Sequence, residues 1–323
     1  MSHNNPMKDQ LPELFGEVTG RRLISVWTHF PQVDMDPNRL VDQVLQFNAK
    51  FPSDILKIPI HGRYCVVDFG CVIEPGSPEY GESGSSSCKT CIVNEINDWE
   101  KIDYVDPLDG HYGQQLQVVK SLRDALPNLP LMLTVFSPTM VMRKLSMNQF
   151  VHHFVKDREK VLDAFKIVNK VTIEFMNAAV DFGVDGIFMA TQEADLSSGL
   201  DRDTLTEIIK LNSNFSQSNK GEFSVLHIHG EQVLFKEAIE AFQPTAVNWH
   251  DDVWPTIEEA RSLFKGGLLA GISPDAILQG DTSRILELTD FPDSSPLILA
   301  PNCVLLQGTK EKTLNEIYQI YRR

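Results

Sequence analysis

Two histidines stand two positions apart in an apolar stretch of the second half of the chain. They are His227 and His229 of SVLHIH, and Glu231 follows closely. If this stretch is a strand, its side chains alternate between two faces, so both imidazoles project to the same side. Imidazole and thiolate are zinc ligands, and a catalytic zinc site keeps one position open. Cys303, at the end of another apolar run, is the candidate third ligand. Glu231 is a candidate fourth ligand or a partner that fixes a histidine tautomer.

Other polar residues also come directly after apolar runs. Four of them are candidate catalytic or substrate-orienting groups: His61, Gln192, Glu193 and His250. If the runs are parallel strands of one barrel, their carboxyl ends meet at one mouth, where such barrels hold their active sites. The sequence therefore predicts a histidine-rich mouth. The competing interpretation is that these histidines only fill space at the barrel rim, or belong to a polar loop across it.

The other four cysteines cluster in one segment of the chain. Cys88 and Cys91 form a C-x-x-C, and Cys65 and Cys71 lie upstream. A structural zinc site usually has two tight pairs, whereas the upstream spacing is loose. A redox C-x-x-C normally opens a helix, but CKTCIVNEI resembles a strand. We interpret these four residues as buried or incidental thiols, with a structural metal site as the alternative.

Short apolar runs alternate with longer amphipathic ones along the chain, which favours βα units and a parallel sheet. Eight runs are expected strands: 23–27, 55–60, 131–136, 186–190, 224–229, 246–250, 267–272 and 297–302. Helical patterns lie between and after them, as in 37–51, 158–183 and 313–323. The fold class is therefore α/β, a (β/α)8 TIM barrel that takes residues 1–323 as a single domain. Residues 64–97, with a Gly/Ser/Pro-rich middle, are expected to form a β-hairpin excursion after the second strand.

Composition excludes several classes of function. The formal net charge is −15, which argues against a nucleic-acid partner, because phosphate-binding surfaces need clustered Lys and Arg. No apolar run approaches the length of about 20 residues that a membrane helix needs. The N-terminal residues lack the order of a signal peptide, and five cysteines fit a reducing compartment. We therefore expect a cytoplasmic protein with a small-molecule substrate and no membrane partner.

Several segments, in this order and spacing, resemble the uroporphyrinogen decarboxylase superfamily. They are SVW, LTVFSPTMVMRKL, GVDGIFMATQEA, LHIHGE, AVNWHDD, GGLLAGISPDAILQGD and LILAPNCVL, spread from about residue 20 to the end. The resemblance implies a (β/α)8 barrel and an enzyme. Members include the haem-pathway decarboxylase, and zinc-dependent methyltransferases that move methyl groups between corrinoid proteins and thiols. The family also implies a homodimer.

The methyltransferase branch matches the chain better than the decarboxylase does. In place of the decarboxylase's arginine-rich loop the chain has THFPQVDMDPN, and KIPIHGR and ATQEA replace its aspartate motifs. The methyltransferases carry histidine-x-cysteine at the fifth strand and a cysteine near the last. His227 and Cys303 match this pattern, while His229 stands at the first cysteine position. The resemblance thus implies zinc on His227, His229 and Cys303, with a corrinoid as co-substrate and a corrinoid protein as possible partner. The alternatives are uroporphyrinogen III decarboxylase and a non-catalytic barrel that binds a corrinoid or tetrapyrrole.

Overall fold

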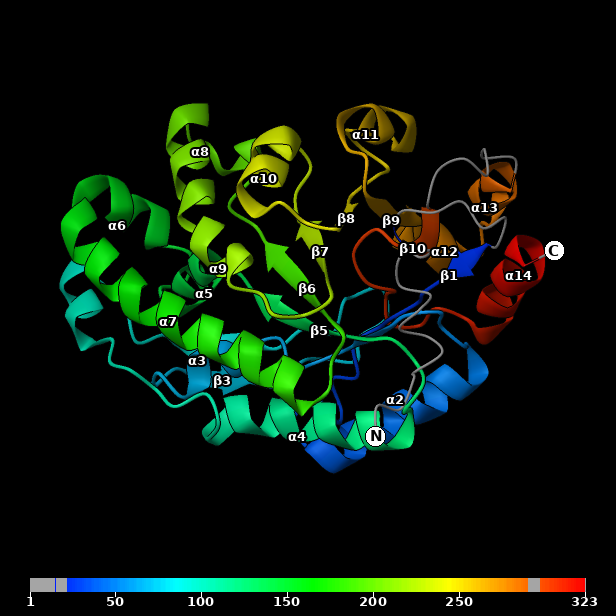
Figure 1. Cartoon of the computed structure of the whole chain (residues 1–323), viewed down its shortest axis with the longest axis horizontal. Coiled ribbons are helices and arrows are strands. Elements are labelled where there is room, and N and C mark those ends of the chain that lie inside the picture. The colour runs from blue at the N-terminus through cyan, green and yellow to red at the C-terminus, as the bar shows by residue number, and fades with distance from the viewer. Residues whose placement is uncertain (1–14, 16–21, 290–296, 323) are drawn as a thin grey trace.

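A curved sheet of eight parallel strands lies at the centre of the molecule, with helices around it (Figure 1). The computed structural model describes residue 15 and residues 22–289 and 297–322. The sheet order is β1-β10-β9-β8-β7-β6-β5-β2, which is the order of a TIM barrel. The strands are β1 (Leu23–Ile24), β2 (Leu56–Ile58), β5 (Leu131–Phe136), β6 (Gly186–Thr191), β7 (Phe223–Ile228), β8 (Ala246–Trp249), β9 (Gly267–Ile272) and β10 (Leu297–Pro301). Each of the eight expected runs overlaps one of them, with β6 and β7 each extending one residue beyond the expected run, so the predicted (β/α)8 fold is confirmed.

The strands are apolar throughout because both of their faces are covered. Alternate residues pack outward against the helices, as Leu131, Leu133 and Val135 of β5 do. The residues between them point into the barrel, where Met132, Phe188 and other apolar side chains form a separate small core. This alternation decides which polar residues of the strands face the barrel interior.

Helices follow most strands and form the outer layer (Figure 1). They are α2 (Pro37–Lys50), α3 (Tyr64–Val67), η2 (Ile96–Lys101), α4 (Gly110–Ala125), α5 (Pro138–Leu145), α6 (Phe150–Lys156), α7 (Arg158–Phe182), η3 (Leu196–Ser198), α8 (Arg202–Leu211), α9 (Ser213–Gln217), α10 (Phe235–Phe242), α11 (Ile257–Leu263), α12 (Pro274–Gln279), α13 (Ser283–Leu288) and α14 (Glu311–Tyr321). The long α7 begins where Asp157 accepts a hydrogen bond from the Lys160 amide. It ends at Gly183, whose φ of 121° suits a residue without a side chain.

The barrel is joined between β1 and β2 by individual hydrogen bonds. Among the described residues no ladder pairs these two strands. Instead the Asp54 amide donates to the Ile24 carbonyl at 2.8 Å, and Ser25 Oγ donates to the Ile55 carbonyl at 2.5 Å. Arg322, just after α14, adds a 3.1 Å contact to the Asp54 carboxylate. This seam holds the first strand against the second.

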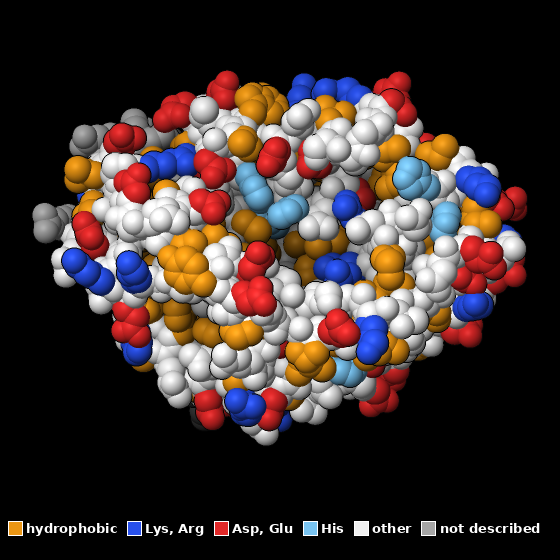
Figure 2. All heavy atoms as spheres, turned by 180° about the vertical axis from the view of Figure 1, so that it is seen from behind, with side chains coloured by type: hydrophobic (Ala, Val, Ile, Leu, Met, Phe, Trp, Pro, Cys, Tyr) orange, Lys and Arg blue, Asp and Glu red, His pale blue; other side chains and the backbone are white. Residues whose placement is uncertain are grey.

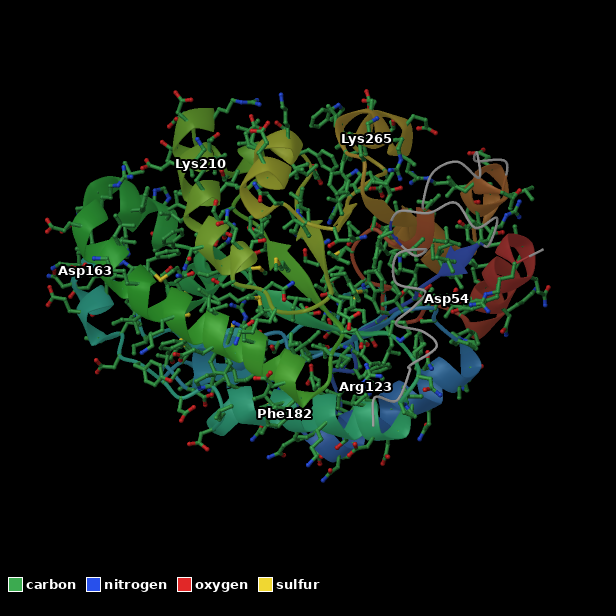
Figure 3. The ribbon with its side chains drawn as sticks, viewed as in Figure 1. Asp54, Arg123, Asp163, Phe182, Lys210 and Lys265 are labelled. Carbon is green, nitrogen blue, oxygen red and sulfur yellow. The ribbon has the colours of Figure 1, made fainter. Side chains whose placement is uncertain are left out.

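A second ion pair braces the amino-terminal side of the sheet. Arg123 at the end of α4 donates to the Asp185 carboxylate at 2.5 Å, and the Leu131 amide donates to the same oxygen at 2.9 Å. Arg123 also donates to the Gly183 carbonyl at 2.7 Å. Figure 3 labels Arg123 together with Asp54 of the seam. Both contacts stand at the beginnings of strands, away from the carboxyl ends.

The expected hairpin excursion is present, but it is shorter than residues 64–97. Its strands are β3 (Val72–Glu74) and β4 (Ser87–Thr90), which pair antiparallel with a bulge between Val72 and Ile73. The first apolar run, YCVV, is the helix α3, because the Tyr64 ring packs on the rings of Tyr112, Phe136 and Phe175. A short apolar run alone does not distinguish a strand from a buried helical turn.

Among the described residues, no helix has both the length and the apolar character needed to cross a membrane.

Candidate metal centre at the carboxyl ends of the strands

The carboxyl ends of β7, β8 and β10 bring four potential metal ligands together. His227 is the inward-facing residue near the end of β7, and His229 follows two positions later. His250 comes directly after β8, and Cys303 comes two residues after β10. One donor atom of each of these four residues lies within 4.8 Å of one donor atom of every other. The predicted trio is therefore gathered in space, and His250 joins it.

Asn248 of β8 determines which nitrogen of His227 is free. The Asn248 amide group donates to the carbonyls of Leu269 and Pro301, at 2.8 and 3.0 Å. Its oxygen is therefore an acceptor, and it lies 2.6 Å from Nδ1 of His227. Nδ1 must carry the proton, which leaves Nε2 with a bare lone pair. A ligating histidine is normally held by such a hydrogen bond from its other nitrogen.

The remaining distances leave little room for anything other than a small ion. His250 Nε2 lies 3.2 Å from His229 Nδ1, and Cys303 Sγ lies 3.8 Å from the same nitrogen. With Zn–N and Zn–S bonds of about 2.0–2.3 Å, donors around a tetrahedral zinc lie roughly 3.3–3.8 Å apart. The donor spacing therefore suits a zinc ion held by ligands of this cluster, after shifts of at most about 1.5 Å. Imidazole and thiolate are also the donor types that zinc prefers.

Burial keeps the three histidines in the form that binds metals. It lowers the pKa of His229 to about 4, with His250 as the next cause, and it lowers the pKa of His227 well below its usual range. The pKa of His250 is also lowered, again mainly by burial. All three rings are therefore neutral near pH 7, which is the ligating form. Burial raises the pKa of Cys303 to about 11, so a metal would have to displace the thiol proton.

A cavity of about 360 Å³ adjoins His227, His229 and Cys303. Three cationic residues also line it: Lys57, Arg63 and Lys144. In Figure 2 histidine side chains lie at the edge of a hollow on this face, with Lys or Arg side chains within it. A small organic molecule fits a cavity of this size.

The two lysines of the cavity lie against aromatic rings. Lys57 Nζ is 4.6 Å from the centre of the Phe188 ring and 5.2 Å from that of Trp27. Lys144 Nζ is 4.4 Å from the Phe136 ring centre. Burial lowers the pKa of both lysines to about 8, so both remain mostly charged at pH 7. Among the residues that the structure describes, neither lysine forms an ion pair with a carboxylate, so an anionic ligand would supply their missing counter-charge.

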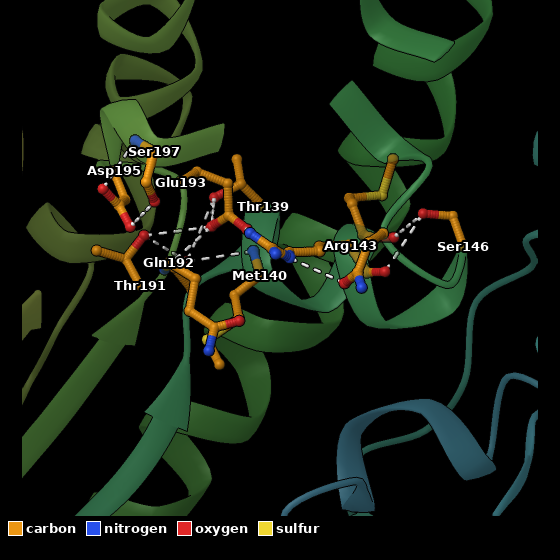
Figure 4. Close-up of polar contacts among 12 residues, drawn as sticks. Thr139, Met140, Arg143, Ser146, Thr191, Gln192, Glu193, Asp195 and Ser197 are labelled. Carbon is orange, nitrogen blue, oxygen red and sulfur yellow. Dashed lines mark hydrogen bonds and ion pairs between the residues drawn. The ribbon is translucent and has the colours of Figure 1, made fainter. Parts of the chain in front are cut away.

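The other predicted site residues lie around this centre. Gln192 lines the cavity, whereas Glu193 is 2% exposed and belongs to a buried network behind it. Glu193 accepts hydrogen bonds from Thr139 and Thr191 at 3.2 and 3.3 Å, and Arg143 lies 4.0 Å away (Figure 4). This geometry suits a group that positions the β6 carboxyl end.

His61 and Glu231 lie outside the donor cluster. His61 is buried beside the cavity-lining residues Ile60 and Gly62, and its Nδ1 accepts from the Arg63 amide at 3.3 Å. Glu231 is exposed and is not one of the four clustered donors. It acts on His250 only by raising that residue's pKa through its charge, a minor cause beside burial.

Three residues of the site have no role in the sequence-based prediction: Lys57, Lys144 and Asn248. Lys57 carries the clearest signal, since it is a lysine in the middle of the apolar run ILKIPI. A charged side chain there must find compensation inside the barrel. Asn248 follows the same alternation as His227, on the neighbouring strand. Lys144 lies on a helix, where strand alternation gives no indication of its position.

Comparisons with known proteins give a family and a fold. The model of the family described as uroporphyrinogen decarboxylase (URO-D) matches residues 19–323. A solved methyltransferase from Methanosarcina mazei is similar over 96% of this chain and 96% of its own, with a TM-score of 0.82 and 18% sequence identity. A B12-independent methionine synthase from Shewanella sp. W3-18-1, in complex with selenomethionine, covers 94% of this chain and 98% of its own, with a TM-score of 0.55 and 13% identity. At these identities the structural likeness shows the shared fold alone. Among curated proteins no significant sequence match is found.

Proposed function

The chain belongs to the uroporphyrinogen decarboxylase family, and we propose that it is a zinc-dependent methyltransferase that acts on a thiol. The observation that carries the proposal is the cluster of imidazole and thiol donors within 4.8 Å of one another, beside a cavity of about 360 Å³. His227, His229 and Cys303 are the proposed ligands. Zinc bound there would lower the pKa of a substrate thiol and make thiolate available at neutral pH.

His250 would orient the substrate. Its Nε2 contacts Nδ1 of His229 at 3.2 Å. That nitrogen of His229 has one lone pair, so it cannot both bind zinc and accept a hydrogen bond. Loading of the site would therefore free His250 to contact the bound substrate. Gln192, in the cavity wall, is a second orienting group.

The cavity favours a substrate that carries an acidic group as well as a thiol. Lys57 and Lys144 lie in the cavity wall without carboxylate partners among the described residues, and Arg63 adds a third positive charge. A carboxylate or similar group on the substrate would pair with these side chains through charge-assisted hydrogen bonds. This pairing would hold the substrate in the cavity beside the proposed metal centre.

The transfer itself follows from a bound thiolate. The substrate sulfur forms a bond to the methyl carbon, and the bond between that carbon and its donor breaks with the electron pair left on the donor. The thiol proton has already passed to solvent. We propose a corrinoid as the donor, free or held by a partner protein.

Metal analysis of purified protein tests the first step. His227→Ala and Cys303→Ala should each lose the zinc of this site, while His152→Ala, at an exposed position on α6, should keep it. Methylcobalamin and mercaptoacetate, incubated with the loaded protein under anaerobic conditions, should give the S-methyl product. Absence of zinc from protein produced with sufficient metal would refute the proposal.

A porphyrinogen decarboxylase is the second candidate, because three cations line the cavity. A tetrapyrrole with eight carboxylates needs more positive charge than these three side chains provide. An anaerobic assay with uroporphyrinogen decides the matter: coproporphyrinogen formation that survives His227→Ala would favour the decarboxylase over the methyltransferase.

A further inference from the structure

Three cysteines from the two sides of the hairpin meet at its base. Cys71 directly precedes β3, Cys88 lies within β4, and Cys91 directly follows β4. Their sulfur atoms all lie within 4.8 Å of one another. The hairpin register produces this meeting, since it pairs Ile73 with Cys88 and Val72 with Thr90. We refer to Cys71, Cys88 and Cys91 as the thiol cluster.

The thiol cluster is enclosed, although the thiols themselves are free. Cys71 and Cys91 are buried, Cys88 is partly exposed, and none of the three forms a disulfide. Two of the thiols contact backbone carbonyls: Cys91 Sγ lies 3.5 Å from the Lys144 oxygen, and Cys88 Sγ lies 3.8 Å from the Val72 oxygen. A thiol is a weak donor, so these contacts add little stability. Cys71 and Cys91 also belong to the hydrophobic core, and Cys88 packs against it.

We propose that the thiol cluster is a second zinc site, held by the thiolates of Cys71, Cys88 and Cys91 with a water as fourth ligand. With Zn–S bonds of about 2.3 Å, the sulfurs of a tetrahedral site lie about 3.8 Å apart, so the cluster needs to contract by at most about 1 Å. Soft thiolate donors select zinc over magnesium or calcium. The partial exposure of Cys88 gives water access to the fourth position.

Arg63 supplies the charge that such a site needs. Zinc with three thiolates carries a net charge of −1, which is unfavourable near a buried apolar surface. The positive charge of Arg63 acts on both Cys88 and Cys91. The Arg63 side chain is held in place by a 3.3 Å hydrogen bond from Nε to the Ser86 carbonyl.

The site would join the two strands of the hairpin at its base, next to the active-site cavity. Ser83, Ser85 and Ser86, between β3 and β4, line the cavity. The far end of the hairpin is attached to the segment after β10, since the Gly81 amide donates to the Gln307 carbonyl at 2.9 Å. Zinc on the thiol cluster would fix the near end. Its role is therefore structural, and it does not depend on the chemistry proposed for the histidine site.

The test is metal content in matched variants, measured by mass spectrometry of the purified chain. We expect about two zinc ions per chain, falling to about one in Cys88→Ser and to about one in His227→Ala. Cys65→Ser is the control, because Cys65 is a buried thiol of the same segment outside the cluster. It should retain about two zinc ions. A single ion that His227→Ala removes and Cys88→Ser leaves would overturn the proposal. A single ion with the opposite response would support it while refuting the histidine site.

Two further measurements keep the proposal falsifiable if Cys88→Ser folds poorly. Cobalt substituted into the wild type should give a stronger thiolate-to-metal charge-transfer band than a site with one thiolate, and most of it should persist in His227→Ala. Chymotrypsin should cut His227→Ala after the exposed Tyr80 several-fold faster once a chelator has removed its remaining zinc, because the base of the hairpin loses its cross-link. Equal cutting together with a Cys88–Cys91 disulfide in freshly isolated protein would contradict the inference.

Discussion

At the scale of single residues, the proposed chemistry depends on hydrogen bonds that keep the proton of His227 on Nδ1 and leave Nε2 free for a metal. Asn248 uses its amide group on two backbone carbonyls and its oxygen on His227, so the free nitrogen of His227 is determined by atoms on β8, β9 and β10. The ring orientation and the tautomer of His227 are therefore set by the protein and do not depend on the metal. This pre-organisation distinguishes His227 from His229, whose contacts are with other members of the cluster.

Asn248→Ala should therefore weaken zinc binding. Without the acceptor at Nδ1, the His227 ring can rotate or change tautomer, and loss of such a partner typically costs about 10- to 100-fold in metal affinity. Competition with a zinc chelator measures the change. Asn212→Ala is the control, since Asn212 is equally buried but hydrogen-bonds Thr139. An unchanged affinity in Asn248→Ala would show that Asn248 has no role at the metal.

Lys57→Met should separate charge recognition from metal binding. The change removes the ammonium group and keeps a side chain that packs on Phe188 and Trp27. We expect the KM for mercaptoacetate to rise about tenfold or more, a loss of about 1.4 kcal/mol, while the KM for neutral mercaptoethanol stays constant. Zinc content should not change. Lys210→Met, on the exposed face of α8, should leave both KM values unchanged.

At the scale of elements, the strands are the part of the structure that the sequence predicts best. Runs such as LMLTVF and GLLAGI are buried on both faces, so they stand out from the amphipathic segments. The first strand is less predictable, because β1 ends at Ile24 while the apolar run continues to Trp27. The prediction that residues 64–67 belong to the hairpin is wrong. These residues form α3, and their apolar character reflects burial against other parts of the fold, as the aromatic contacts of Tyr64 show.

The sequence predicts which side chains of the site lie close together when they come from one strand or from the same end of the barrel. Strand alternation places His227 and His229 together, and the mouth of the barrel brings Cys303 to them. The thiol cluster depends instead on the register of β3 and β4 with a bulge, which residue spacing does not reveal. Lys144 reaches the cavity through the packing of α5, and this too lies beyond periodicity.

The end of α7 offers a test of helix termination. Gly183 has a φ of 121°, and a Cβ there would lie 2.8 Å from Cγ of Arg123. Gly183→Ala should thus lower the free energy of unfolding by about 2–3 kcal/mol, through backbone strain and the clash together. Gly199→Ala is the control, since its φ is 79° but no atom of the described residues lies within 4 Å of the added carbon. We expect a loss of only about 1 kcal/mol there, measured by chemical denaturation.

At the scale of the whole molecule, buried neutral histidines make stability depend on pH. His61 is 1% exposed, and burial, with smaller effects of His111 and Lys144, lowers its pKa to about 4. The unfolded chain binds a proton at His61 below about pH 6.5, whereas the folded chain does so only below about pH 4. The free energy of unfolding should therefore fall as the pH drops from 6.5 to 4.

His61→Gln should make this pH dependence shallower. The expected difference between the wild type and the variant grows by roughly 1–2 kcal/mol between pH 7 and pH 5, because one pKa unit corresponds to about 1.4 kcal/mol. Urea denaturation at a series of pH values measures it. His152→Gln, at an exposed position, should follow the wild type. Parallel pH profiles for wild type and His61→Gln would show that His61 does not titrate differently in the folded chain.

The position of β1 in the sheet has a consequence for folding during synthesis. β1 forms its sheet ladder with β10, which comes last in chain order among the described strands, and Arg322 reaches the seam from beyond α14. While the ribosome is still making the second half of the chain, β1 has no neighbour on that side, and the growing sheet keeps an open edge. Such edges invite pairing with other chains. The β1–β10 ladder, and with it closure of the barrel, can therefore form only after β10 has been synthesised.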